Sequence, residues 1–473
     1  MNWVKMVKIT ENKRGIVVKK CEDLKQKHVL VLGLGVTGLP VATVLRRLGN
    51  EVTINDRHEP ADEETVETCQ KLGIGLVTGS HPTNLLSDKA IDLVVKNPGI
   101  PYENPMVVKA QSLNIPVITD LELVSLLCEG DLIGITGSNG KTTTTEMTYL
   151  LLKAAYDKRV HLGGNIGIPL MTVIQTVKPE DYLVMELSSF QLAGTKALAP
   201  HIAAITNIYS AHLDYHHSRA AYIEAKMNIT RHQTADDYII YNANGEELPS
   251  LVTSHSKAKQ IPFSSSRRLE NGYWCDDHSI YFGDQKLFDS SIVTIPGIQN
   301  KENAMIAIAV ARLLGVSDEV IAEKLPTFKG VKHRLQFLKN YHGVDIYNDS
   351  KATNIAATKT ALHSFDKDVV LIAGGLDRGN GFDDLKEAVK PVKKAFVYGQ
   401  TKEKLADFFT RLAIPVVVVP DLECATKEAF KTIHSGDTLL FSPACASWDM
   451  YHTFEERGDH FISLVTQLTA DQK

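Results

Sequence analysis

The stretch DLIGITGSNGKTTTTEMTYLLL, from Asp131 to Leu152, decides the fold of its region. DLIGIT has the apolar character of a strand, and the residues after the glycines have the pattern of a helix. A glycine-rich turn between a strand and a helix N-terminus lets backbone N–H groups and the helix dipole bind a phosphate. The usual phosphate loop has a glycine where this chain has Ile135, so the loop departs from the common pattern.

This setting predicts a nucleotide-binding loop. We expect Lys141 to meet the terminal phosphates and the Thr142 hydroxyl to reach Mg²⁺. The competing interpretation is a plain strand–helix turn with a lysine on the surface.

On both sides of this stretch, short β-branched runs alternate with helical patterns, which is typical of parallel α/β sheets. We predict three α/β domains, over residues 1–119, 120–330 and 331–473. In the second domain, residues 274–288 are expected to form a hairpin. In the third, the runs VDIYNDSKAT, VVLIAGG, KAFVYG, PVVVVP and DTLLFSP are each expected to be a strand followed by a helix.

The composition excludes several classes of protein. The chain has 473 residues, 44% of them hydrophobic, and a net charge of −5, so there is no basic footprint for nucleic acid or an anionic membrane. Its six cysteines form no CxxC pair, which argues against a zinc or redox site. No apolar run is long enough to span a bilayer, and the N-terminus lacks the apolar core of a signal peptide. We expect a cytoplasmic monomer that binds neither nucleic acid nor a membrane.

A second glycine cluster, GLGVTG at Gly33 to Gly38, also follows a strand-like run. Its spacing matches the dinucleotide fingerprint, and Asp56 lies about 20 residues further on, where it would hold the ribose of NAD. Glycines also close tight strand–helix turns that bind nothing. The motif by itself leaves both possibilities open.

Three further residues are candidates for a metal site. Glu186 ends an apolar strand, where a carboxylate would lie beside the phosphate loop, and the alternative is an edge glutamate facing solvent. His212 follows another strand, although a lone histidine is more often structural than a ligand. Lys226, within a helical pattern, would ordinarily be a solvated lysine.

Taken together, GITGSNGKTTT, ELSSFQL and HLDYHHSRAAYIEAK resemble the Mur ligase superfamily, whose phosphate loop has this glycine spacing. The segments YNDSKATN and SPACASWDMYHTFEERGD are similar to those of its D-glutamate-adding members. The resemblance covers nearly the whole chain in the expected order. It implies a Rossmann-like N-terminal domain, a central P-loop-type ATPase domain with a mostly parallel sheet, and a Rossmann-like C-terminal domain.

The resemblance also implies a reaction. D-Glutamate would be joined to UDP-N-acetylmuramoyl-L-alanine through an acyl phosphate, with release of ADP and phosphate, in peptidoglycan precursor synthesis. Lys141, with two Mg²⁺ ions, would neutralise the charge of the transferred phosphoryl group. The metal ligands would be Thr142, Glu186, His212 and Lys226, the last as a carbamate formed with CO₂.

The same resemblance assigns the substrate sites. The ATP-binding residues would be Gly137, Ser138, Asn139, Gly140, Lys141, Thr142, Thr143, Asn300, Asn303, Arg334 and Asp349. The GLGVTG loop would hold the UDP-sugar instead of NAD, with Gly35, Val36, Thr37, Asn55, Asp56, Arg57, Asn97, Gly99, Asn165 and Ser188. D-Glutamate would meet Lys351, Thr353, Arg378, Ser447 and Phe454.

Two other functions remain as alternatives. An NAD-dependent oxidoreductase would use the GLGVTG loop, but it leaves Lys141 and the SPACASWDM segment unexplained. A non-catalytic nucleotide-dependent switch would turn over ATP regardless of a UDP-sugar or D-glutamate.

Overall fold

The computed structural model describes residues 24–60, 62–166, 168–209, 213–379 and 381–470, and the backbone of a hairpin of strands β1 (Lys8–Glu11) and β2 (Val17–Lys20). The chain forms two compact units. One comprises Met1–Ser290 and Glu302–Lys324, and the other Ser291–Lys301 and Leu325–Lys473. No helix among the described residues is long and apolar enough to cross a membrane.

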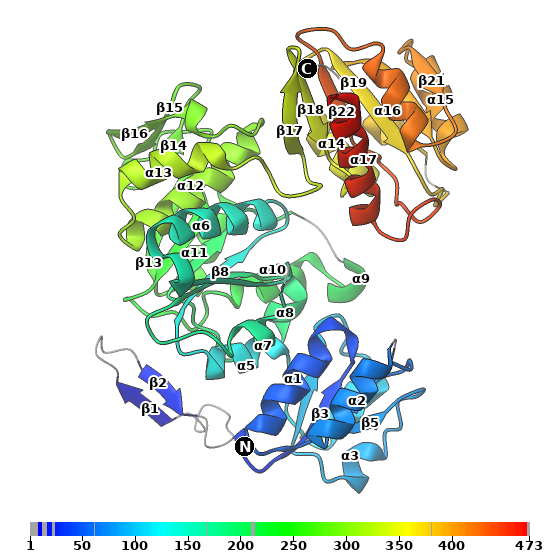
Figure 1. Cartoon of the computed structure of the whole chain (residues 1–473). Coiled ribbons are helices and arrows are strands. Elements are labelled where there is room, and N and C mark those ends of the chain that lie inside the picture. Colours follow the sequence, from blue (N-terminus) through cyan, green and yellow to red (C-terminus); the bar gives the residue numbers. More distant parts are fainter. Residues whose placement is uncertain are drawn as a thin grey trace. The chain divides into compact units, whose positions relative to one another are not determined.

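The first sheet of the first unit has five parallel strands in the order β5-β4-β3-β6-β7. These strands are β3 (His28–Leu32), β4 (Glu51–Asn55), β5 (Gly75–Val77), β6 (Leu93–Lys96) and β7 (Val117–Ile118). The helices around them are α1 (Gly35–Arg47), α2 (Glu63–Leu72), α3 (Leu85–Asp88), α4 (Pro105–Ser112) and α5 (Asp120–Leu127). Figure 1 labels β3 and β5 of this sheet, with α1, α2 and α3. The strand order reverses between β3 and β6, and ligands of doubly wound sheets bind at such a switch point.

Both faces of this sheet are buried, which explains why its strands are continuously apolar. In β3, Val29 and Val31 pack in the cluster that includes α1, whereas Leu30 and Leu32 pack with the residues of α3 and α4. Successive side chains of a strand point to opposite faces, so HVLVL needs apolar residues at every position after the first.

The second sheet has nine strands in the order β16-β15-β14-β13-β12-β11-β8-β10-β9. The strands are β8 (Asp131–Thr136), β9 (Val160–Gly164), β10 (Tyr182–Glu186), β11 (Ile202–Ile205), β12 (Tyr238–Asn242), β13 (Lys259–Ser264), β14 (Tyr273–Cys275), β15 (Ser279–Phe282) and β16 (Gln285–Asp289). Its helices are α6 (Lys141–Tyr156), α7 (Leu170–Val173), α8 (Ser189–Ala193), α9 (Leu213–His216), α10 (Arg219–Met227), α11 (Glu247–His255), α12 (Ile298–Leu313) and α13 (Asp318–Lys324). Residues 273–289 form an antiparallel meander of three strands, one more than the predicted hairpin.

The parallel part of this sheet places the phosphate-binding region at its centre. Strand β8 lies between β10 and β11, with Glu186 opposite Ile135 and Ile205 opposite Thr136. Because these strands are parallel, their carboxyl ends meet at one edge. The prediction that Glu186 lies beside the loop after β8 is therefore confirmed.

The second unit contains six strands in the order β17-β18-β22-β19-β20-β21, all parallel except the β17–β18 pair. They are β17 (Gln336–Tyr341), β18 (Val344–Asn348), β19 (Val369–Gly374), β20 (Val392–Tyr398), β21 (Val416–Val418) and β22 (Thr438–Phe441). One face is covered by α14 (Ile355–Leu362) and α15 (Lys402–Arg411), the other by α16 (Leu422–Phe430) and α17 (Phe454–Leu468).

One connection of this unit differs from the prediction. Between β19 and β20, the described residues contain a single short 3₁₀ helix, Asp383–Leu385, and no α-helix. The sequence here, GGLDRGNG, is rich in glycine, which disfavours a helix by about 1 kcal/mol per residue relative to alanine. The expectation of a helix after every strand was therefore wrong at this place.

Candidate active site

The predicted phosphate-binding loop lies between β8 and α6. Gly140 has a left-handed backbone, with φ of +82°, and a Cβ atom there would lie 2.5 Å from the Asn303 Oδ1 atom. Only glycine satisfies both conditions. The Lys141 ammonium group folds back over the loop and donates to the carbonyl oxygens of Gly137 and Ser138, each at 2.9 Å. The loop therefore holds a cation at a helix N-terminus, as phosphate binding requires.

Side chains from residues 206–222 hold the loop in place. The Thr206 hydroxyl donates to the Asn139 carbonyl at 2.6 Å, and Asn207 Oδ1 accepts from the Asn139 N–H at 2.9 Å. The hydroxyl groups of Tyr222 and Ser138 are 2.8 Å apart. The loop shape is thus set by contacts from the two residues after β11 and from α10, as well as by its glycines.

The first turn of α6 and the helix α12 contain the other predicted ATP residues of this region. Thr142 and Thr143 are buried in that turn. The Thr144 hydroxyl donates to Asn303 Oδ1 at 3.0 Å, so Asn303 lies next to the loop. Asn300 is also buried, and its Nδ2 atom donates to the Pro296 carbonyl at 2.6 Å.

Glu186 is buried, with 2% of its surface exposed. Its Oε1 atom accepts from Asn165 Nδ2 at 2.9 Å, whereas Oε2 has no hydrogen-bond partner among the described residues. Burial, and next the charge of Glu186, raises the pKa of Glu146 on α6. A buried carboxylate oxygen without a partner is costly unless a cation reaches it. This oxygen fits a hard cation such as Mg²⁺.

Lys226 lies on α10 with only 1% of its surface exposed, so the reading of a solvated helix lysine is wrong. Its Nζ atom donates to the Gly137 carbonyl at 2.7 Å and lies 4.8 Å from the centre of the Tyr222 ring. Burial, and next the charge of Lys141, lowers the pKa of Lys226 to about 6, although Glu186 opposes the shift. At pH 7 this amine is mostly neutral.

The predicted histidine ligand, His212, lies outside the described residues. Within the described part of the chain, no group of three or more His, Cys, Asp and Glu side chains is arranged to hold a metal. The donors predicted here are of another kind: the Thr142 hydroxyl, one carboxylate and a lysine.

The predicted UDP-sugar residues of the GLGVTG loop come together at the switch point of the first sheet. A Cβ atom on Gly38 would overlap the Gly33 carbonyl, so the tight turn needs glycine there. Asn97, which follows β6, donates from Nδ2 to the Thr37 hydroxyl at 3.1 Å, and its Oδ1 atom accepts from the Gly99 N–H at 3.1 Å. Gly35 and Val36 are exposed in the same loop.

The segment after β4 has a mainly internal role. Asp56 Oδ2 accepts from the Leu34 N–H at 2.7 Å and thereby holds the glycine loop. Asn55 is fully buried, and its Nδ2 atom donates to the carbonyls of Val77 and Ser80 at 2.9 and 2.8 Å. Arg57 is exposed. The structure thus leaves Arg57 free to reach a ligand, while Asn55 is used inside the domain.

Asn165 and Ser188 lie in the second sheet's domain, beside Glu186. The Asn165 N–H donates to the Glu186 carbonyl at 2.9 Å, in addition to the side-chain contact described above. The Ser188 hydroxyl accepts from the Gln191 N–H and caps α8. Asn165 therefore contacts Glu186, and Ser188 follows Glu186 by two residues in the sequence.

In the second unit, the predicted ATP residues Arg334 and Asp349 lie near each other. Asp349 accepts from the Leu335 N–H at 3.0 Å and from the Ser442 hydroxyl at 2.7 Å. Burial raises the pKa of Asp349 to about 7, although these bonds and the charges of Arg334 and Arg457 oppose the shift.

Two of the predicted D-glutamate residues, Thr353 and Arg378, line a cavity of about 700 Å³ at the carboxyl ends of the strands of this unit. Lys359, on α14, adds a cation to its wall. The Arg378 guanidinium lies 4.9 Å from the centre of the Trp448 ring. Two aspartate side chains also line this wall, so it carries charges of both signs. The two cations are the groups that would meet an acidic ligand.

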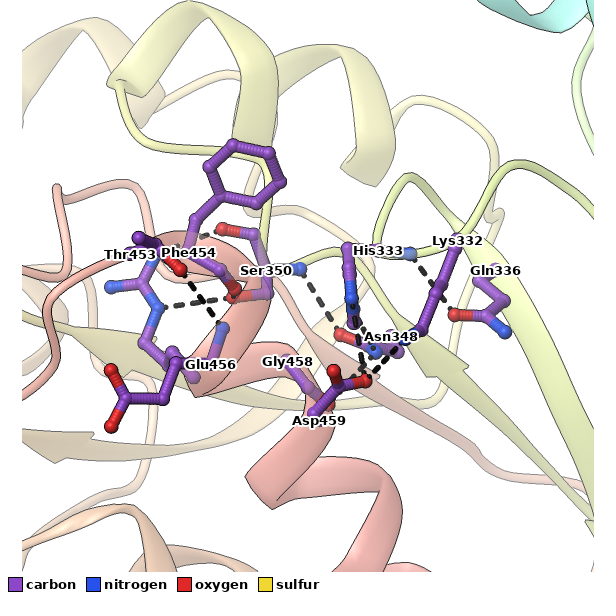
Figure 2. Close-up of polar contacts among 11 residues, drawn as sticks. Lys332, His333, Gln336, Asn348, Ser350, Thr453, Phe454, Glu456, Gly458 and Asp459 are labelled. Carbon is purple, nitrogen blue, oxygen red and sulfur yellow. Dashed lines mark hydrogen bonds and ion pairs between the residues drawn. The ribbon is translucent and has the colours of Figure 1, made fainter. Parts of the chain in front are cut away.

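Two of the other predicted D-glutamate residues, Lys351 and Phe454, lie close together beside Ser350 and the start of α17. The Ser350 hydroxyl donates to the Phe454 carbonyl at 2.8 Å (Figure 2). Arg457, fully buried, donates from Nη2 to the Ser350 carbonyl at 2.8 Å. The Lys351 ammonium lies 5.3 Å from the Phe454 ring centre, and Ser447 is buried.

Sequence reasoning missed several residues of these sites. Tyr222 and Thr206 hold the phosphate loop, Arg457 holds Ser350, and Lys96 is buried beneath Asn97 and Gly99. Tyr222 and Arg457 lie within two of the segments that carry the resemblance, HLDYHHSRAAYIEAK and SPACASWDMYHTFEERGD, but their local spacing does not assign them a contact. A charged residue at the end of an apolar strand, as in LVVK, was the one available signal for Lys96.

Three family models match the chain in sequence. They describe a MurD-like N-terminal domain of Mur ligases over residues 27–119, a Mur ligase middle domain over 135–311 and a glutamate ligase domain of Mur ligases over 333–445. The UDP-N-acetylmuramoylalanine–D-glutamate ligase of Listeria innocua is 46% identical over 95% of this chain and 99% of its own. The enzyme of the same name from Enterococcus hirae is 47% identical over 95% and 98%.

This chain belongs to the Mur ligase family. Solved structures of other Mur ligases have the same fold. The UDP-N-acetylmuramate–alanine ligase of Thermotoga maritima superposes with a TM-score of 0.56 at 20% identity, over 94% of this chain and 100% of its own. The MurF ligase of the same organism, in complex with ADP, gives 0.53 at 18% identity, over 99% and 100%. The predicted fold, with its three α/β domains, is confirmed.

Proposed function

We propose that this Mur ligase joins D-glutamate to UDP-N-acetylmuramoyl-L-alanine at the expense of ATP, in peptidoglycan precursor synthesis. The observation that carries the proposal is the 46–47% identity, along 95% of the chain, to D-glutamate ligases. No finding favours the oxidoreductase alternative. In that reading Asp56 would hold a ribose, whereas here one of its carboxylate oxygens is occupied by the Leu34 N–H.

The phosphate loop supports the ATP part of the proposal. Lys141 would neutralise the γ-phosphate as the substrate carboxylate attacks it, because two anions must meet in that step. Gly137, Ser138, Asn139, Gly140 and Thr143 would surround the phosphates through backbone groups, with Asn303 next to them. Asn300, Arg334 and Asp349 are the proposed ATP residues of the second unit.

The ligands of the proposed Mg²⁺ ions are Thr142, Glu186, His212 and Lys226. When bound, two such ions would supply the positive charge that lets the acceptor carboxylate approach the phosphate. The Oε2 atom of Glu186, which has no hydrogen-bond partner among the described residues, is the observation that supports a cation here.

A lysine can ligate Mg²⁺ only after its charge is reversed. We propose that the neutral Lys226 amine attacks CO₂, forming an N–C bond and releasing a proton, to give an anionic carbamate. The pKa of about 6 supports this, because a neutral amine is the nucleophile required. The short distance to the Gly137 carbonyl keeps this group beside the phosphate loop.

The remaining proposals concern the sites of the other two substrates, the domain boundaries and the oligomeric state. The UDP-sugar would bind at the switch point of the first sheet, through Gly35, Val36, Thr37, Arg57, Asn97 and Gly99, and reach Asn165 and Ser188. Asn55 and Asp56 would support this site from inside the domain. D-Glutamate would occupy the cavity of the second unit, with Thr353 and Arg378 at one carboxylate and Lys351, Ser447 and Phe454 completing the site. We also propose domain boundaries at 119/120 and 330/331 and a monomer that works in the cytoplasm.

One experiment tests the proposal. The purified chain is given ATP, Mg²⁺ and UDP-N-acetylmuramoyl-L-alanine, and phosphate release is followed with D-glutamate or L-glutamate. Phosphate and ADP are expected only with D-glutamate. ATP turnover that ignores both the UDP-sugar and the amino acid would indicate a nucleotide-dependent switch, and release of AMP would overturn the acyl-phosphate route.

A further inference from the structure

Lys96, the last residue of β6, is a buried charged group to which the proposed reaction gives no role. Only 1% of its surface is exposed. Its Nζ atom lies 2.8 Å from the Ile100 carbonyl, 3.2 Å from that of Pro98 and 3.4 Å from that of Asn97. No carboxylate of the described residues forms an ion pair with it. The ammonium group instead satisfies its donors within the turn that follows its own strand.

This turn, residues 97–100, carries two of the proposed UDP-sugar contacts, Asn97 and Gly99. Each carbonyl that accepts from Lys96 is oriented toward the ammonium, so the backbone path of the turn is determined by one buried cation. The orientation of the Asn97 amide between Thr37 and Gly99 depends on that path. Lys96 therefore acts on the sugar site through the turn.

The fourth acceptor of Lys96 comes from the other domain of this unit. Its Nζ atom lies 3.2 Å from the Tyr215 hydroxyl, which in turn donates to the Pro98 carbonyl at 3.1 Å. Tyr215 belongs to α9, and its ring packs at 4.5 Å from that of Phe190 on α8. The Lys96–Tyr215 contact thus links the 97–100 turn to α9. Through the Tyr215–Phe190 ring contact it also links this turn to α8, the helix that begins after Ser188.

We propose that Lys96 is a positioning residue for the UDP-sugar: it sets the shape of the 97–100 turn and, through Tyr215, aligns this turn with the helices beside the phosphate loop. The inference rests on the proposed function. The surroundings of Lys96 favour the charged form of its amine. Burial lowers the pKa of Lys96 to about 8, and the charges of Asp120 and Glu103 keep it from falling further. The ring of Tyr102, 4.6 Å away, also favours a cation.

The test compares Lys96→Met, which keeps the length of the side chain, with Lys109→Met, an exposed lysine on α4 of the same domain. KM is measured for each of the three substrates, and the binding of UDP-N-acetylmuramoyl-L-alanine is measured by calorimetry without ATP. Lys96→Met should weaken the UDP-sugar about tenfold in both measurements, as expected for the loss of one or two hydrogen bonds, and change KM for ATP and D-glutamate less than about twofold. Lys109→Met should match the wild type.

A second variant keeps the inference testable if Lys96→Met does not fold. Tyr215→Phe removes a single hydroxyl and should weaken the UDP-sugar by about threefold or more. In the double variant the two effects should not add, because both act through one contact. An unchanged KM for the UDP-sugar, or equal increases for all three substrates, would overturn the inference. If the wild type itself neither binds nor uses the UDP-sugar, the proposed function fails instead.

Discussion

Lys96 and Lys226 are two lysines of the same unit, each with 1% of its surface exposed, but their surroundings favour different protonation states. Lys96 has carbonyl and hydroxyl oxygens around its ammonium group, from Asn97, Pro98, Ile100 and Tyr215. Lys226 has the Gly137 carbonyl at 2.7 Å and a more distant hydroxyl at 3.5 Å. Equal burial therefore does not mean equal solvation by the protein.

The neighbouring charges increase the difference. Burial is the main cause in both cases, but it lowers the pKa of Lys96 to about 8 and that of Lys226 to about 6. Carboxylates at Asp120 and Glu103 support the charge of Lys96, whereas the Lys141 ammonium opposes the charge of Lys226. At pH 7 the first lysine is mostly a cation and the second mostly a neutral amine. A buried lysine is thus a donor or a nucleophile according to its neighbours.

The largest effect is expected when the nucleophile is removed. Lys226→Met should reduce phosphate release by about a thousandfold or more, because the carbamate ligand is lost from a site that must neutralise two anions. Added acetate should restore part of the activity by supplying carboxylate oxygens. Lys109→Met is the control and should retain full activity. A Lys226→Met enzyme that works normally without acetate would remove the carbamate from the proposal.

The second effect concerns the carboxylate beside Lys226. Glu186→Gln should lower kcat by about a hundredfold, as a metal ligand would be lost. The free energy of unfolding should stay equal or rise by about 1 kcal/mol, since the variant removes a buried negative oxygen for which the described part of the chain offers no hydrogen-bond partner. Chemical denaturation and steady-state kinetics on the same preparation check both parts. A large loss of stability would show that Glu186 is structural.

The third effect separates the two lysines by stability. Lys96→Met should lower the free energy of unfolding by about 1–3 kcal/mol, because the carbonyls of its turn lose their donor. Lys226→Met should leave it unchanged or raise it at pH 7, since the variant removes an amine that must lose its proton on folding. Urea denaturation of both variants at pH 7 measures the difference. Equal losses would mean that the two sites are alike, contrary to the comparison.

The smallest effect is a dependence on pH. The folded-state pKa of unmodified Lys226, about 6, lies below the ordinary lysine value of 10.5, so between these values the unfolded chain binds more protons. Stability should therefore rise with pH in that window, by at most about 1.4 kcal/mol per pH unit. Measured between pH 6.5 and 8 in CO₂-free buffer, the slope should be smaller in Lys226→Met than in the wild type. An identical slope in both proteins would contradict the lowered pKa of Lys226.

Much of the fold was accessible from the sequence because its signals are local. The strand, glycine turn and helix from Asp131 to Leu152 formed as predicted, and Glu186 lies beside them because parallel strands end at one edge. The errors also have local causes. The connection after β19 has no α-helix among its described residues, and its sequence is rich in glycine. The predicted two-stranded hairpin has a third strand, β16.

By itself, the sequence determined which residue types stand at the phosphate loop and at the ends of the strands. Only the tertiary structure decided that Lys226 is nearly neutral, that Glu186 has an unpartnered oxygen and that Lys96 joins two domains. The physical reason is distance along the chain. The Lys226–Gly137 bond spans 89 residues and the Lys96–Tyr215 bond 119, so desolvation and neighbouring charges arise from contacts that no local pattern encodes.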